Sequence, residues 1–166
     1  MILGMSMATF VLVHVVISLI AIVAGLVVMF GMLGSNRQPG LTAIFLLFTI
    51  LTSATGFLFP FTKLLPSHVV GIISVVLLAI ATFALYGGRL VGIWRPVFTV
   101  TATLSLYLNV FVLVVQSFLK IPLLNGWAPT QTEPAFLVAQ GATLLVFLGL
   151  TILATLKFRP ARLAAH

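Results

Sequence analysis

The side chains of this chain that could bind a cofactor are few, and two histidines come first among them. His14 and His68 fall near the starts of two apolar segments. If those segments are membrane helices running in the same direction, the two imidazoles lie at similar depth and could hold haem b from opposite faces. The alternative is that His14 bonds a neighbouring Ser or Thr hydroxyl and His68 is an interfacial residue in the first turn of its helix. The spacing alone favours these structural roles.

A polar stripe runs along the apolar stretch from residue 97 to residue 120. Its members, Thr101, Ser105, Asn109, Val112 and Gln116, follow at steps of three or four and share one helix face. An amide in hydrocarbon needs hydrogen-bond partners, so the stripe must face protein. Asn109 and Gln116 could bind a quinone carbonyl or a lipid headgroup. Holding neighbouring helices together is the commoner role of such residues, and for Asn109 we favour it.

Catalytic chemistry is restricted by what the chain lacks. There is no cysteine, and Glu133 is the single acidic side chain. Thiolate nucleophiles, iron–sulfur clusters, carboxylate pairs and a nucleotide-binding loop with its magnesium carboxylate are therefore excluded within this chain. Glu133 precedes Pro134 at an expected helix start, where an acid also complements the helix dipole. We expect a protein that is not an enzyme.

The composition defines the elements that must position these residues. The chain has 166 residues, 62% of them hydrophobic and 5% charged, with a mean hydropathy of +1.35. These values indicate an all-α integral membrane protein with one transmembrane domain over residues 1–166. We predict a bundle of five transmembrane helices, with spans at 5–33, 41–61, 67–86, 97–120 and 134–157.

The basic residues predict the orientation of this bundle. One side of the membrane would hold six cations, and the other side would hold Lys63 and Lys120. The six are Arg37, Arg89, Arg95, Lys157, Arg159 and Arg162. The positive-inside rule then puts the N-terminus outside and the C-terminus in the cytoplasm, for a multi-pass protein of the inner (cytoplasmic) membrane. Cations dispersed in this way are typical of membrane proteins, so we expect no nucleic-acid partner.

With this orientation, the polar side chains gather in the outer half of the bilayer. Apart from the two histidines, the members are Thr52, Ser53, Asn109, Gln116 and Gln140. The inner halves read as almost purely Leu, Val, Ile and Ala. This asymmetry predicts a polar cavity or binding site that opens to the outer face above an apolar floor and holds a lipid or quinone.

Three functions follow from these expectations. The first is a non-catalytic accessory subunit of a larger membrane complex, with membrane lipids and other membrane subunits or a second copy as partners. The second is a redox or ligand-binding protein that uses His14 and His68 for haem b or another ligand. The third is a carrier or channel for a neutral solute, against which the apolar inner halves count.

Overall fold

The structure, a computed structural model, describes residues 2–60 and 66–159, and within them five helices are long and apolar enough to cross a membrane. This confirms the predicted all-α membrane bundle. The long helices, with their intervening short elements, run α1 Met7–Leu33, α2 Pro39–Phe57, α3 Pro66–Thr82 with its π-helical continuation η1 Phe83–Gly87, α4 Trp94–Lys120, α5 Pro122–Trp127 and α6 Pro134–Lys157.

The predicted spans differ from the helices mainly at their ends. The second helix starts at Pro39 and ends at Phe57, because a proline at the first helical position is favoured and Gly56 and Pro60 weaken the far end. Ser67 lies inside α3, which begins at Pro66. The connection between the predicted spans 97–120 and 134–157 contains the short helix α5, which again starts at a proline.

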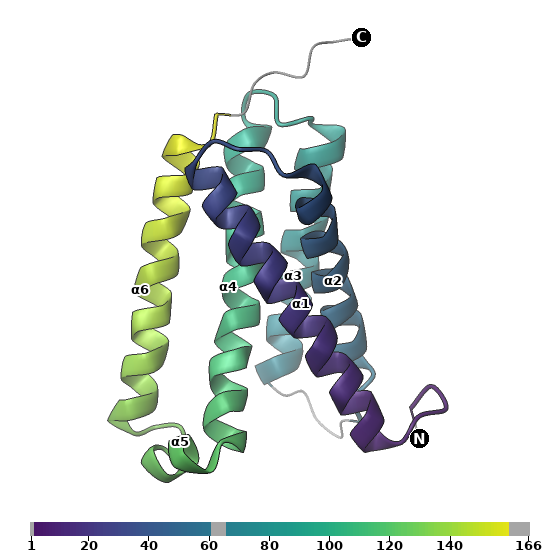
Figure 1. Cartoon of the computed structure of the whole chain (residues 1–166), viewed down its shortest axis with the longest axis vertical. Helices are drawn as coiled ribbons and strands as arrows, with labels where there is room; N and C mark the ends of the chain where they lie inside the picture. Colours follow the sequence, from purple (N-terminus) through teal and green to yellow (C-terminus); the bar gives the residue numbers. More distant parts are fainter. Residues whose placement is uncertain (1, 61–65, 160–166) are drawn as a thin grey trace.

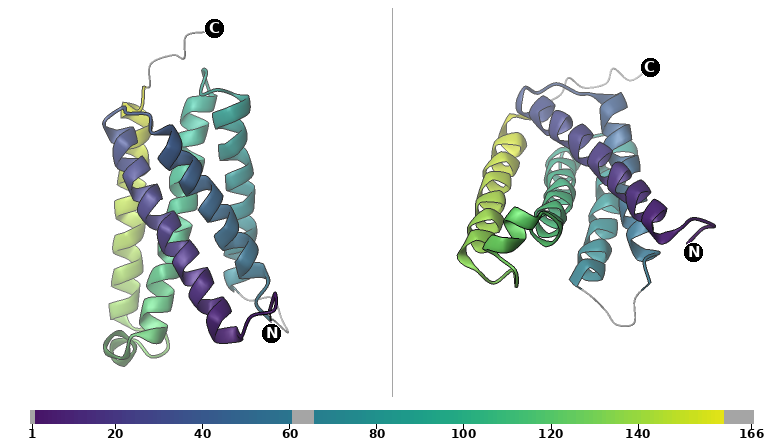
Figure 2. Two further views of the ribbon diagram at one scale, coloured as in Figure 1. Left: turned by 45° about the vertical axis from the view of Figure 1, so that its right-hand side comes forward. Right: turned by 60° about the horizontal axis from the view of Figure 1, so that its bottom comes forward.

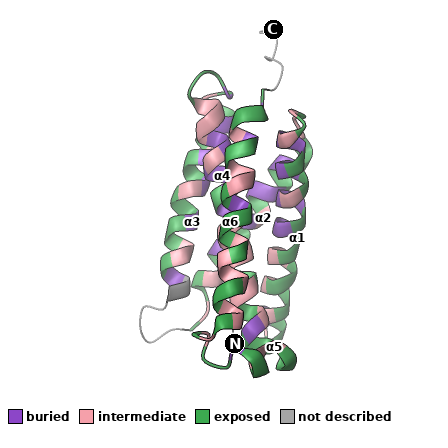
Figure 3. Cartoon of the chain, turned by 90° about the vertical axis from the view of Figure 1, so that its left-hand side faces the viewer, coloured by how far each residue is buried: buried purple, intermediate pink, exposed green. Residues whose placement is uncertain are grey.

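Helix α4 is the centre of the bundle. It packs against α1, α2, α3 and α6, while α1 pairs most extensively with α2 and α2 also packs against α3 (Figures 1 and 2). Helix α6 is peripheral, and only Phe147 and Ala154 of its 24 residues are buried. Figure 3 shows this helix nearest the viewer, with exposed and intermediate residues along most of its length.

The chain connections place the described cations mainly at one end of the bundle. The α1–α2 loop, the turn after η1 and the end of α6 lie together at the top of Figure 1. We call this the cation-rich end, and its cations are Arg37, Arg89, Arg95, Lys157 and Arg159. Lys120 closes α4 at the opposite end, beside α5. Lys63 and Arg162 lie outside the described residues.

The halves of the helices near the cation-rich end are not purely apolar, so that expectation was wrong. Thr42, Thr99, Thr101 and Thr103 are all buried there. The hydroxyls of the three α4 threonines each donate to the carbonyl four residues earlier, at 2.7–3.0 Å. A threonine that bonds its own helix in this way can be buried in hydrocarbon without a partner from elsewhere.

Gly25 marks the closest approach of α1 to its neighbours. A Cβ added there would lie 2.6 Å from Leu106 Cδ1 of α4 and 2.8 Å from the ring of Phe45 of α2. Both of these side chains are buried almost completely. The absence of a side chain at position 25 therefore sets how closely α1, α2 and α4 pack.

We expect Gly25→Leu to destabilise the bundle by about 1–3 kcal/mol, the usual cost of overpacking a filled core. The measurement is the thermal unfolding midpoint in mild detergent, which should fall. Gly126→Leu is the matched control, because nothing lies within 4 Å of a Cβ at that position. An equal effect of both substitutions would contradict this account of the core.

Candidate functional site

His14 bonds helix α2. Its Nδ1 lies 2.7 Å from Thr55 Oγ1, and its ring meets Phe59 edge to face at a centroid distance of 5.2 Å. The Thr55 hydroxyl donates its proton to the carbonyl of Leu51 at 2.7 Å. Because a hydroxyl has one proton to give, Thr55 Oγ1 accepts from His14 Nδ1–H. This bond gives the histidine the structural role that the sequence favoured.

His68 is buried on another side of α2. Its ring stacks on Phe57 with a centroid distance of 6.5 Å and an interplanar angle of 26°. Thr55 and Phe57 are two residues apart, hence about 200° apart around the helix. The contacts of the two histidines therefore lie on opposite faces of α2. The two imidazoles thus have separate contacts on α2, and a haem held between them stays a prediction.

The hydrogen bond between His14 and Thr55 predicts a measurable coupling energy between substitutions at these two positions. We expect His14→Ala and Thr55→Val to be non-additive by about 0.6 kcal/mol, the average for hydrogen bonds between membrane helices, and by no more than about 1.7 kcal/mol. Unfolding free energies of the wild type, both single variants and the double variant supply the cycle. A coupling near zero would show that the contact contributes nothing to the packing of α1 on α2.

The predicted amides do not form one cluster. Asn109 Nδ2 lies 3.5 Å from Thr49 Oγ1 of α2, whereas Gln140 Nε2 of α6 donates to the Phe111 carbonyl at 3.1 Å. Asn109 and Phe111 are about 200° apart around α4, so these contacts lie on opposite sides of that helix. Gln116, two turns beyond Asn109 on the same side, is exposed.

The other two residues expected to bind a ligand lie on α2. Thr52 donates to the carbonyl of Phe48 at 2.8 Å, and Ser53 is buried. Thr52 thus bonds its own helix, Ser53 lies inside the bundle, and Asn109 contacts α2 from α4. The side chains expected to form one outer site therefore lie apart, with Asn109 between α4 and α2 and Gln140 between α4 and α6.

The interface between α4 and α6 is bonded at both ends, which the sequence did not reveal. Near the opposite end, Gln131 Nε2 donates to the Val115 carbonyl at 2.9 Å, one turn from the bond of Gln140. Toward the cation-rich end, Thr151 Oγ1 lies 3.0 Å from Thr103 Oγ1. A helical pattern could not identify Gln131, because it lies in the loop before α6.

Glu133 organises that loop. Its Oε1 accepts from the Thr130 backbone N–H at 3.1 Å and the Thr130 hydroxyl at 2.8 Å, and its Oε2 accepts from the Thr132 N–H at 3.0 Å. Desolvation raises the pKa of Glu133, but these hydrogen bonds outweigh it and hold the pKa below its usual range. Glu133 is also the N-cap residue of α6, directly before Pro134 at the helix start that the sequence predicted.

This arrangement predicts a pH dependence of the loop. A carboxylate whose pKa is lowered on folding stabilises the loop above its unfolded pKa, and that stabilisation is lost as the pH falls through the lower, folded pKa. We expect amide exchange of Thr130 and Thr132 to accelerate in that acidic window. Glu133→Gln should exchange faster already at neutral pH and show no such transition. A wild-type loop with unchanged exchange across the window would contradict this assignment.

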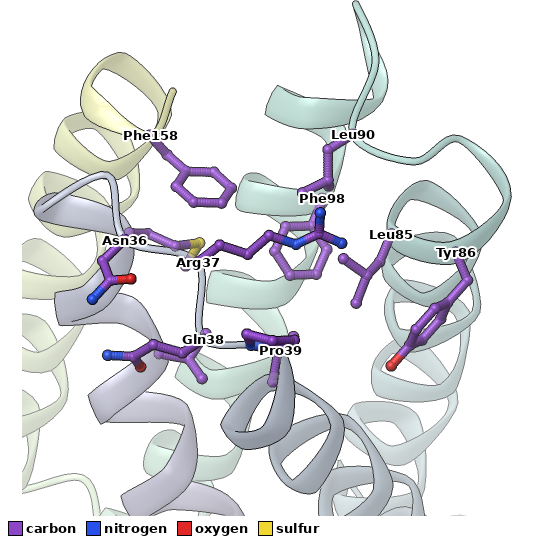
Figure 4. A pocket seen from close by; sticks show the side chains of 12 residues that line it. Asn36, Arg37, Gln38, Pro39, Leu85, Tyr86, Leu90, Phe98 and Phe158 are labelled. Carbon is purple, nitrogen blue, oxygen red and sulfur yellow. The ribbon is translucent and has the colours of Figure 1, made fainter. Parts of the chain in front are cut away.

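A cavity at the cation-rich end was missed by the sequence analysis. It has a volume of about 40 Å³, roughly three times the space that one water molecule needs. The α1–α2 loop, η1, α4 and the residue after α6 line it, through Arg37, Gln38, Leu85, Tyr86, Phe98 and Phe158. Figure 4 shows Arg37 reaching across the cavity, while the amides of Asn36 and Gln38 turn away. Sequence reasoning used Arg37 only to orient the chain.

Comparison with known proteins identifies no relative: no protein-family model, no curated protein and no solved structure matches this chain.

Proposed function

We propose that this chain is a non-catalytic helical subunit of a larger membrane assembly, and that the outward face of α6 contacts a partner helix. The observation that carries the proposal is a row of apolar residues and open glycines along that face. The proposal includes the orientation inferred from the cations, with the N-terminus outside and the C-terminus in the cytoplasm of an inner membrane.

The outward face has the spacing of a helix–helix seam. Val138, Gly141, Leu145, Leu148 and Ile152 recur at steps of three and four, the pattern by which left-handed helix pairs interdigitate. Val138 and Leu145 are each 69% exposed, far more than a residue packed within the bundle. Lipid alone could cover such a surface, so the exposure of these residues does not by itself indicate a partner helix.

Two glycines of α6 do indicate a partner helix on this face. Nothing lies within 4 Å of a Cβ built at Gly141 or Gly149, so packing within the described chain requires neither. A glycine inside a helix costs about 1 kcal/mol relative to alanine. At an interface between membrane helices, small residues instead allow the backbones to approach closely. A partner on this face would give the two glycines a role.

The hydrogen bonds on the other face of α6 support the same proposal. Gln140 and Thr151 bond α4 near the two ends of the helix. These bonds hold α6 in one rotation about its own axis, with Gly141 turned outward. In this proposal, the polar residues expected to bind a lipid or quinone, Asn109 and Gln140 among them, serve helix association.

The test is the mass of the assembly extracted from native membranes in polymer-bounded lipid particles. We expect the wild type in a particle containing more protein than one chain of 17.8 kDa. Gly141→Leu should weaken the association about tenfold or more, because overpacking costs about 1–3 kcal/mol.

Gly40→Leu is the matched control, since Gly40 is a helical glycine with open space outside α6. It should leave the assembly intact. A wild type that is a single chain in native lipid, or an assembly that survives Gly141→Leu, would overturn the proposal. Peptide mass mapping of the particle tells a second copy from a different subunit.

A further inference from the structure

The cavity at the cation-rich end is lined by a guanidinium, that of Arg37, which has no counter-charge among the described residues. Arg37 forms no hydrogen bond or ion pair within the part of the chain that the structure describes, and its side chain is half-buried. Figure 4 shows it extending toward the apolar side chains of Leu85 and Phe98. A partly desolvated cation is costly unless an anion accompanies it.

The chain has no acidic side chain to offer at this end. Its single one, Glu133, bonds Thr130 and Thr132 in the loop at the opposite end of the bundle. The start of α2, at Pro39, also lines the cavity, and its N-cap residue Gln38 makes no side-chain capping bond. The positive end of the helix dipole thus adds to the field of Arg37. Both features favour an anion from outside the chain.

A second, larger hollow shares one wall residue, Tyr86, with this cavity. It is an open groove of about 540 Å³ between α2 and the α3–η1 segment. Tyr86 lines both hollows, so they adjoin at this residue. Its other walls are almost entirely apolar and include Ile50, Val75, Leu78, Ala79 and Phe83.

The length of the groove matches one leaflet. From Tyr86 to Val75, the helix descends eleven residues, which is about 16 Å at 1.5 Å per residue. Half of a hydrocarbon core of about 30 Å has nearly the same depth. The π-helical turn η1 leaves both Phe83 and Tyr86 more than half exposed at the headgroup end of this path.

We propose that this end of the bundle binds an anionic phospholipid, with its phosphate against Arg37 and one acyl chain in the groove between α2 and α3. Basic pockets between membrane helices at the cytoplasmic side have the chemistry that selects such headgroups. Tyr86, with an apolar ring and a polar hydroxyl, lies where headgroup and chain meet. The site is independent of the α6 face and remains if that proposal fails.

Trp94 can report on the occupant. Its ring packs edge to face against Phe83 of the groove wall at a centroid distance of 5.0 Å. The chain has one other tryptophan, Trp127, which is exposed beside the opposite end. Trp127→Phe therefore makes Trp94 the single fluorophore without disturbing the site.

The experiment reconstitutes the Trp127→Phe protein into phosphatidylcholine vesicles that contain a minor fraction of phosphatidylglycerol. Bromines on the acyl chains of either lipid quench a nearby tryptophan. At the same fraction of each lipid, brominated phosphatidylglycerol should quench Trp94 more than brominated phosphatidylcholine does. The difference should correspond to an about fivefold enrichment of phosphatidylglycerol beside Trp94, because one cation favours an anionic lipid by about 1 kcal/mol.

Two variants test the two parts of the site. Arg37→Gln should reduce the enrichment to about onefold by removing the charge, and Ala79→Phe should do the same by filling the groove. Arg89→Gln removes a charge from the same end at an exposed residue outside both hollows, so the enrichment should persist.

Equal quenching by both lipids in the wild type would overturn the proposal. An equal loss in Arg37→Gln and Arg89→Gln would also overturn it, because general surface charge would then explain the enrichment. Suppression of the enrichment by inorganic phosphate would identify a site for free phosphate instead of a lipid.

Discussion

The structure depends on one constraint: hydrocarbon offers no hydrogen-bond partner, so the protein must satisfy its own polar groups. The buried threonines of α4 do so through carbonyls of their own helix, and His14 does so through Thr55 of α2. Gln140 and Gln131 reach carbonyls of α4 from α6 and the loop before it. Three of the side chains expected to contact a ligand, His14, Asn109 and Gln140, thus contact a neighbouring helix.

The central position of α4 determines how these bonds are distributed. One of its sides packs against α1, α2 and α3, and α6 lies along another (Figure 2). Asn109 consequently contacts α2, whereas the Phe111 carbonyl is bonded from α6. The same arrangement leaves most of α6 outside the core, with a fixed face that the rest of the described chain does not cover.

The charged residues that the structure describes are separated along the length of the bundle. Five described cations lie at one end, and the one acidic side chain lies in a loop at the other. Arg95 bonds the Phe158 carbonyl at 2.6 Å and so ties α4 to the end of α6. Arg37 has no such bond, and it extends over a cavity that adjoins an apolar groove. Of these two arginines, Arg95 is thus bonded within the bundle, whereas Arg37 borders a cavity.

The sequence by itself determined the class of the protein, the five helices and the alternation of charge, because hydropathy, helix length and cation position act locally along the chain. Of the stripe expected to face protein, Thr101 and Ser105 are buried, whereas Gln116 at its far end is exposed. Only the tertiary structure decided that His14 contacts Thr55 and His68 contacts Phe57 on α2, and that Arg37 and Tyr86 line one cavity. A helical pattern defines the face on which a residue lies, but which helix covers that face depends on packing between segments far apart in the chain.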